Sequence, residues 1–109
     1  MTALTIPAGE LVVQDPSDIR VYVFDWDTDN LSAGVLITGS TFTITAIRPP
    51  GDTALIKDNE AIQAGSRTTQ LRLSVGTLGA LYEIANRIVT NESVAQTKEQ
   101  SFRLLIQNR

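Results

Sequence analysis

The densest cluster of residues that could do chemistry lies at the end of an apolar segment, where Asp25, Asp27 and Asp29 alternate along the chain. Carboxylate oxygens at this spacing can hold a hard cation such as calcium. An EF-hand loop would need glycine in place of Asn30 and a bidentate glutamate in place of Leu36. A solvated acidic turn that ends a strand is therefore the favoured interpretation, and calcium binding is the alternative.

The residue types that the chain lacks exclude most catalytic chemistry. Its 109 residues include no histidine and no cysteine. A histidine general base, a Ser-His-Asp triad, a thiol nucleophile, a zinc knuckle and a disulfide framework are all excluded on this ground. Paired carboxylates can hydrolyse glycosides, but alternate positions in one loop of a small domain form no enclosed pocket. We therefore expect no enzymatic activity.

The charge balance and the N-terminal sequence bound the partners. A net charge of −3 gives no clustered basic surface for a phosphate backbone, so we expect no nucleic-acid partner. The first residues lack a basic leader followed by an apolar stretch, and no window approaches the ~18 apolar residues of a membrane span. We expect a soluble protein without a membrane partner.

The hydrophobic pattern predicts β-strands along most of the chain. In residues 41–47, Phe42, Ile44 and Ala46 alternate with threonines and Ile47, which is the period-two pattern of a half-buried strand. Such segments are predicted at residues 19–26, 41–47, 54–57, 61–64, 70–75, 81–89 and 101–107. Turn-forming residues separate them at about 8–12-residue spacing. We predict an all-β fold: an immunoglobulin- or fibronectin-like antiparallel β-sandwich of about seven strands.

The same pattern sets the domain boundaries. A chain of this length forms one domain, which we place at residues 15–109. Residues 1–14 precede it as an arm or an added strand. Within the domain, Asp58, Asn59 and Glu60 have the composition of a hairpin turn between the predicted strands 54–57 and 61–64.

A turn followed by a tyrosine marks the start of the predicted strand 81–89. Gly76 and Gly79 form the turn, and Tyr82 is the first inward residue of the strand. This order is typical of a tyrosine corner, in which the ring fills the core while the hydroxyl anchors a loop.

Three further residues carry polar or aromatic groups inside apolar strands. Trp26 is the only tryptophan, and we expect it in the core rather than in a binding site. An inward Asn86 must be fully hydrogen-bonded, because an unsatisfied buried amide costs about 1–3 kcal/mol. Arg87 would then point outward, toward a carboxylate of the same sheet or of a neighbouring subunit.

Apolar residues without a place in the predicted core indicate an interface. The strand 19–26 is apolar on both faces, and a single sandwich buries only one of them. The N-terminal segment is also apolar, and we predict that it adds a strand to a neighbour's sheet edge. The candidate interface residues are Leu4, Ile6, Leu11, Val13 and Leu105.

The C-terminal third resembles a known family. The pattern runs from Gly76 and Gly79 through Tyr82, Asn86 and Arg87, and ends in Ser-Phe-x-Leu-x-Ile, in which Phe102 follows Ser101. It is similar to the end of small tailed-bacteriophage and prophage proteins described as fibre–tail adaptor or virion structural proteins. The Asp-Pro at residues 15–16 and the Asp-Trp at residues 25–26 also resemble that family. The chain departs from it at Gln14, where relatives have lysine, and at Gln100, where they often have arginine.

This resemblance implies a non-enzymatic virion component that is made in the cytoplasm of the bacterial host. Its partners would be other virion proteins, and it would form a homo-oligomer or ring at the neck, the tail or the fibre attachment region. A rival function from another class is an adhesin-like or decoration module that binds sugar or protein, with or without calcium. Its binding surface would combine Trp26 with residues 27–30 and 48–53.

Overall fold

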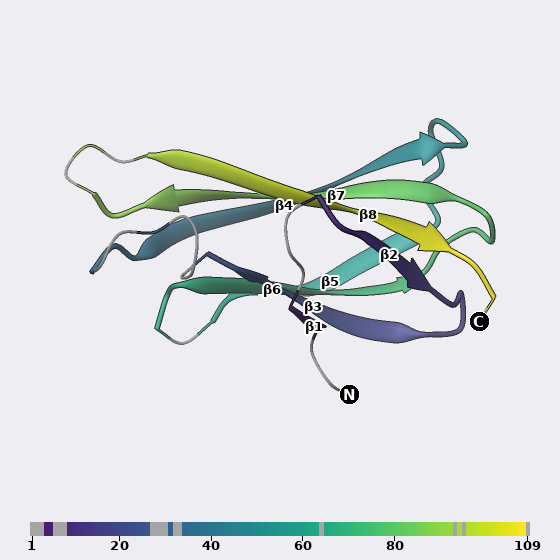
Figure 1. Ribbon diagram of the computed structural model, residues 1–109, viewed down its shortest axis with the longest axis horizontal. Helices are drawn as coiled ribbons and strands as arrows, with labels where there is room; N and C mark the ends of the chain where they lie inside the picture. The colour runs from purple at the N-terminus through teal and green to yellow at the C-terminus, as the bar shows by residue number, and fades with distance from the viewer. Residues whose placement is uncertain are drawn as a thin grey trace.

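The computed structural model describes residues 4–5, 9–26, 31, 34–63, 65–92, 94 and 96–108. These residues form eight strands and no helix (Figure 1). The strands are β1 (Leu4–Thr5), β2 (Leu11–Gln14), β3 (Ile19–Asp25), β4 (Ile37–Arg48), β5 (Leu55–Ile62), β6 (Thr68–Val75), β7 (Leu81–Thr90) and β8 (Thr97–Ile106). Accordingly, no helix long and apolar enough to cross a membrane is found in the described part of the chain.

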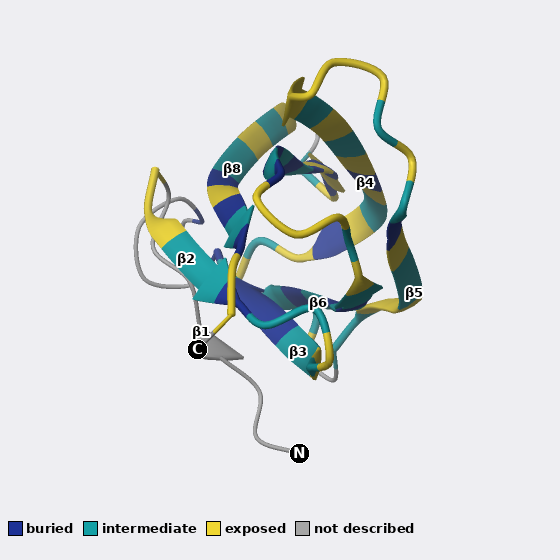
Figure 2. Cartoon of the chain, turned by 90° about the vertical axis from the view of Figure 1, so that its right-hand side faces the viewer, coloured by how far each residue is buried: buried dark blue, intermediate teal, exposed yellow. Residues whose placement is uncertain are grey.

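The strands form two four-stranded sheets that pack face to face (Figures 1 and 2). Sheet A has the order β1-β3-β6-β5, and sheet B has the order β2-β8-β7-β4. All neighbours are antiparallel except the pairs β1–β3 and β2–β8, which are parallel. The prediction of an all-β sandwich is confirmed, and its immunoglobulin-like detail stays a prediction.

The sequence-based division around Asp58 is wrong. Residues 54–57 and 61–64 were expected to be two strands joined by a hairpin turn, but β5 runs through this segment as one strand beside β6. The turn-like residues form a bulge instead, with a register shift between Asp58 and Ala61 and a positive φ of 51° at Asn59. A bulge accommodates the left-handed residue without reversing the chain, because pairing with β6 continues on both sides.

The N-terminal segment supplies strands that the hydrophobic pattern did not place. Leu11–Gln14 pairs with Arg103–Ile106 of β8, so these four residues complete the chain's own sheet B. Leu4–Thr5 pairs with residues 22–23 of β3 in sheet A. The prediction that this segment adds a strand to a neighbour's sheet is therefore wrong for Leu11–Gln14, which add a strand to a sheet of their own chain.

The core lies between the sheets and contains an aromatic cluster. Tyr22 and Phe24 of β3 lie within 5.2 and 5.6 Å, respectively, of the Phe102 ring on β8, measured between ring centroids. Phe24 also lies 5.8 Å from Phe42 of β4. Rings at these distances in tilted arrangements attract one another beyond the burial of their area. On the outer face of β3, Val23 is buried and Ile19 remains exposed, so the second apolar face of this strand is only partly covered.

Candidate functional site

A buried amide joins the two sheets at one end of the core. Asn86 of β7 donates through Nδ2 to Ser40 Oγ at 2.9 Å and to the Thr41 carbonyl at 3.1 Å, both on β4. Its Oδ1 accepts from Trp26 Nε1 at 3.0 Å and from the Thr69 hydroxyl. Its two donors and its acceptor oxygen are thus engaged, as the requirement for a buried amide predicts. This polar cluster is a structural tie between sheets A and B.

The turn before β7 is held by the Tyr82 hydroxyl. It accepts from the Thr77 backbone N–H at 3.1 Å and donates to Asp52 Oδ1 at 2.6 Å, while the ring is fully buried. Asp52 also accepts from the Thr77 hydroxyl at 2.6 Å and from the Ala54 N–H at 2.9 Å. These hydrogen bonds, that of Thr77 foremost, hold the pKa of Asp52 below its ordinary value. Burial, and then the hydrogen bond to Asp52, raises the pKa of Tyr82.

The two glycines of this turn have separate backbone roles. Gly76 has a φ of +85°, and a Cβ there would lie 2.8 Å from Ile106 Cγ1, so only glycine fits without a shift. Gly79 has a φ of +83° and donates its N–H to the Ile106 carbonyl at 2.7 Å. The turn is thus fastened to the end of β8.

A second buried amide joins β2 to sheet A, at Gln14, which the sequence marks only as a departure from the family pattern. Gln14 is fully buried, and its Nε2 donates to the carbonyls of Asp18 and Leu73, each at 3.1 Å. Its Oε1 accepts from the Tyr22 hydroxyl at 2.6 Å. Because Gln14 belongs to sheet B through the pairing of β2 with β8, its side chain closes the sandwich along that side.

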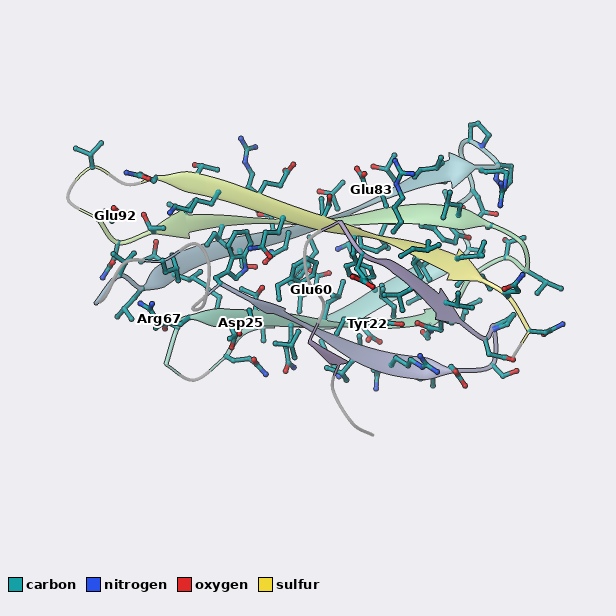
Figure 3. The ribbon with its side chains drawn as sticks, in the orientation of Figure 1. Tyr22, Asp25, Glu60, Arg67, Glu83 and Glu92 are labelled. Atoms are coloured by element: carbon teal, nitrogen blue, oxygen red, sulfur yellow. The ribbon has the colours of Figure 1, made fainter. Side chains whose placement is uncertain are left out.

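The residues proposed for an adhesin-like surface are not brought together. Trp26 is fully buried, and its backbone N–H donates to the Arg67 carbonyl beside the start of β6. Residues 48–53 begin with Arg48, the last residue of β4, and lie at the opposite end of the sandwich from Arg67 (Figures 1 and 3). The prediction of one binding surface that combines Trp26 with residues 48–53 is therefore wrong, because Trp26 and these residues lie at opposite ends of the strands.

The three aspartates considered for calcium are only partly described. Asp25 is the last residue of β3, opposite Thr68, whereas Asp27 and Asp29 lie outside the described residues. In the described part of the chain, no group of three or more acidic side chains is placed to hold a metal ion.

Arg87 and Phe102 lie on opposite sides of sheet B. Arg87 is exposed on the outer face and stands opposite Glu99 in the register of β7 and β8. Phe102 points into the core. The outward direction of Arg87 follows from the inward direction of Asn86, because successive strand residues point to opposite faces.

The outer face of sheet B carries a groove. It has a volume of about 540 Å³ and is lined by residues of β2, β4, β7 and β8 together with the turn before β2. Its lining residues are Gly9, Leu11, Arg48, Leu81, Glu83, Ser101, Phe102, Arg103 and Leu105. Figure 3 shows Glu83 on the outer side of this sheet and Tyr22 between the sheets. Leucines thus lie among two arginines and a glutamate, and we call this surface the sheet B groove.

The candidate interface residues divide between the two sheets. Leu105 stands beside Val13 of β2 and Leu81 of β7 in the strand register, and Leu11 stands two pairs away along β2, on the same face. Leu4 belongs to β1 in sheet A, and Ile6 lies outside the described residues. The structure therefore brings Leu11, Val13 and Leu105 together on one face.

These features define an all-β sandwich whose inward polar side chains tie the sheets together. Residues 14–105 match the sequence model of the family described as podophage GP4 fiber-tail adaptor protein gp77. The chain belongs to this phage fibre–tail adaptor family, which confirms the resemblance found in its C-terminal third. No curated protein matches the chain.

Proposed function

We propose that this protein is a non-enzymatic connector in a phage tail, which docks other virion proteins on the sheet B groove. Membership of the fibre–tail adaptor family supports the role in the tail. The shape and lining of the sheet B groove support the choice of this face as the docking surface. Docking of this kind needs no cofactor, and the protein would be made in the host cytoplasm before it joins the virion.

The observation that carries the proposal is the combination of leucines and charges in the groove. Leu11 is 55% exposed, although it lies within a strand. It stands opposite Arg103 of β8, which in turn stands opposite Glu83 of β7. Protein interfaces have an apolar centre with a polar rim and are enriched in arginine. The groove has this composition.

The proposal is tested by copurification of the full chain with the tail and, separately, with the fibre protein of the same phage. Leu11→Glu places a charge in the groove, and we expect it to weaken capture of at least one partner by about tenfold or more, as loss of a central contact does. The matched control is Ile56→Glu, because Ile56 is 48% exposed on sheet A.

The control should bind as the wild type does, and both variants should keep the wild-type circular dichroism spectrum and melting temperature. If Leu11→Glu captures both partners as well as Ile56→Glu does, the groove is not the docking surface. If the wild type captures neither partner, the connector role itself is overturned.

A further inference from the structure

The sheet edges of this sandwich differ in how they are protected against pairing with another chain. Natural proteins shield sheet edges with short strands, charges, prolines or bulges. β1 has two residues and β2 has four, so these edges are short. β5 has the bulge after Asp58 and carries Lys57 and Glu60. The part of β8 that extends beyond β2 carries Lys98 and Glu99.

The middle of the β4 edge, residues 39–46, has none of these devices, because the two register shifts of this strand lie near its ends, between Ile37 and Gly39 and between Ala46 and Arg48. β4 is 12 residues long and pairs on one side with β7, while none of the described strands pairs with its other side. It has no proline, and its only charge is Arg48 at its end. Threonine, isoleucine and phenylalanine, which favour strands, fill its middle. Figure 2 shows β4 and β5 along the same side of the sandwich.

A hollow lies beside this edge. It has a volume of about 310 Å³ and is lined by Ser40 and Phe42 of β4 together with Glu60, Ala61 and Ile62 of β5. It lies between the edge strands of sheets A and B, which do not pair with each other. A strand added to β4 would border this hollow.

We propose that β4 pairs antiparallel with β4 of a second copy of this chain, around Thr43. The sequence is nearly symmetric about this residue: reversal places Thr41 opposite Thr45 and Phe42 opposite Ile44. Cross-strand threonine pairs and aromatic–β-branched pairs are favourable, and no like charges meet. The same operation on β5 about Asn59 would place Asp58 opposite Glu60, which is unfavourable.

The symmetry about Thr43 and the absence of like-charge repulsion therefore select β4, and not β5, as the edge that accepts its own copy. The contact is isologous, so it closes as a twofold dimer and joins two copies of sheet B into one continuous sheet. It uses a strand edge and not the sheet B groove, so it goes beyond the docking proposed above.

The mass of the full chain in solution tests this proposal. Sedimentation over concentrations from about 1 µM to about 1 mM should show a monomer–dimer equilibrium, which spans the affinity range of a modest interface. Over the same range, amide hydrogen exchange should slow in residues 37–48 and stay constant in residues 55–62. A wild type that remains monomeric throughout overturns the proposal.

Charge variants separate strand pairing from other contacts. Thr43 is exposed, so both Thr43→Lys and Thr43→Glu should fold normally, and each should weaken dimerisation by about tenfold or more because like charges then face each other. An equimolar mixture of the two should dimerise again. Thr97→Lys, at an exposed position of β8, makes the same charge change and should dimerise as the wild type does.

Equal loss in Thr43→Lys and Thr97→Lys, or no recovery in the mixture, overturns the proposed pairing. Sedimentation measures this contact and copurification measures the groove, so either proposal can fail without the other.

Discussion

At the scale of single residues, polar groups in the core determine which sheets and strands are tied together. Asn86 contacts β4 in its own sheet, and through Trp26 and Thr69 it contacts sheet A. Buried networks of this kind contribute most when every member is satisfied. The spacing that made Asn86 conspicuous in an apolar strand therefore marks a structural position rather than a binding site.

Replacement of Asn86 by leucine should lower the free energy of unfolding by about 1–3 kcal/mol, because groups that it satisfies lose their partner while the side-chain volume changes little. Urea denaturation at neutral pH measures this loss. The neighbouring Arg87→Ala is the control, and its effect should stay within about 0.5 kcal/mol because Arg87 is exposed. Equal effects of the two substitutions would contradict the role given to Asn86.

Asp52 makes stability depend on pH. Its pKa is lowered in the folded state, mainly by the Thr77 hydroxyl and then by Tyr82. The corresponding stability is fully present above the ordinary pKa of 3.8 and is lost as the pH falls through the lower folded value. Asp52→Asn should therefore flatten the fall in unfolding free energy below about pH 4. Urea titrations at several pH values test this, and an unchanged acid slope would contradict it.

Asp58 and Tyr82 also make stability depend on pH. Arg72 lowers the pKa of Asp58 through a bidentate contact, so Asp58 supplies an acid slope that remains in Asp52→Asn. The raised pKa of Tyr82 acts at alkaline pH. The stability that Tyr82 contributes to the folded state is fully present below its ordinary pKa of 10.0 and is lost as the pH rises through the higher folded value.

At the scale of elements, β2 depends on two kinds of attachment. Its backbone pairs with β8, and the Gln14 side chain reaches the carbonyl of Leu73 in the opposite sheet. Gln14→Leu should lower the free energy of unfolding by about 1–3 kcal/mol. It should also speed amide exchange in residues 11–14 more than in β7, because β2 loses its tie to sheet A.

The exposed Gln107 provides the control for this experiment. Gln107→Leu makes the same chemical change just after β8 and should alter stability by less than about 0.5 kcal/mol. If exchange in residues 11–14 is the same in both variants, the Gln14 side chain does not hold β2.

The elements also show how far the sequence predicts this structure. Strands with strict alternation, such as residues 70–75, are predicted well because Leu71 and Leu73 are buried while the residues between them are partly exposed. The alternation fails only at the end of this strand, where Val75 is exposed. β2 was not placed in this way, since the apolar run 11–13 has no alternation and its parallel partner is remote in sequence. The sheet B groove contains Leu11 and Leu105, which the hydrophobic pattern indicates as interface residues, but the groove itself is not predicted, because its residues meet only once the register of four strands is known.

At the scale of the whole molecule, both sheets share one core, so the domain should unfold as a unit. Trp26 is the single tryptophan and is bonded to residues of both sheets. Its fluorescence and the far-UV circular dichroism should therefore follow the same urea transition, as in two-state unfolding. A fluorescence transition at lower urea than the dichroism transition would show that the Trp26 end opens separately.

The parallel pairing of β2 with β8 has a mechanical consequence. The two strands run in the same direction, so the first residue of β2 and the last residue of β8 lie at opposite ends of their ladder. A force that pulls these two ends apart loads the ladder in shear, and its hydrogen bonds must break together rather than one after another. Resistance to such traction is governed by the rate of forced unfolding, and it would suit the connector role that we propose.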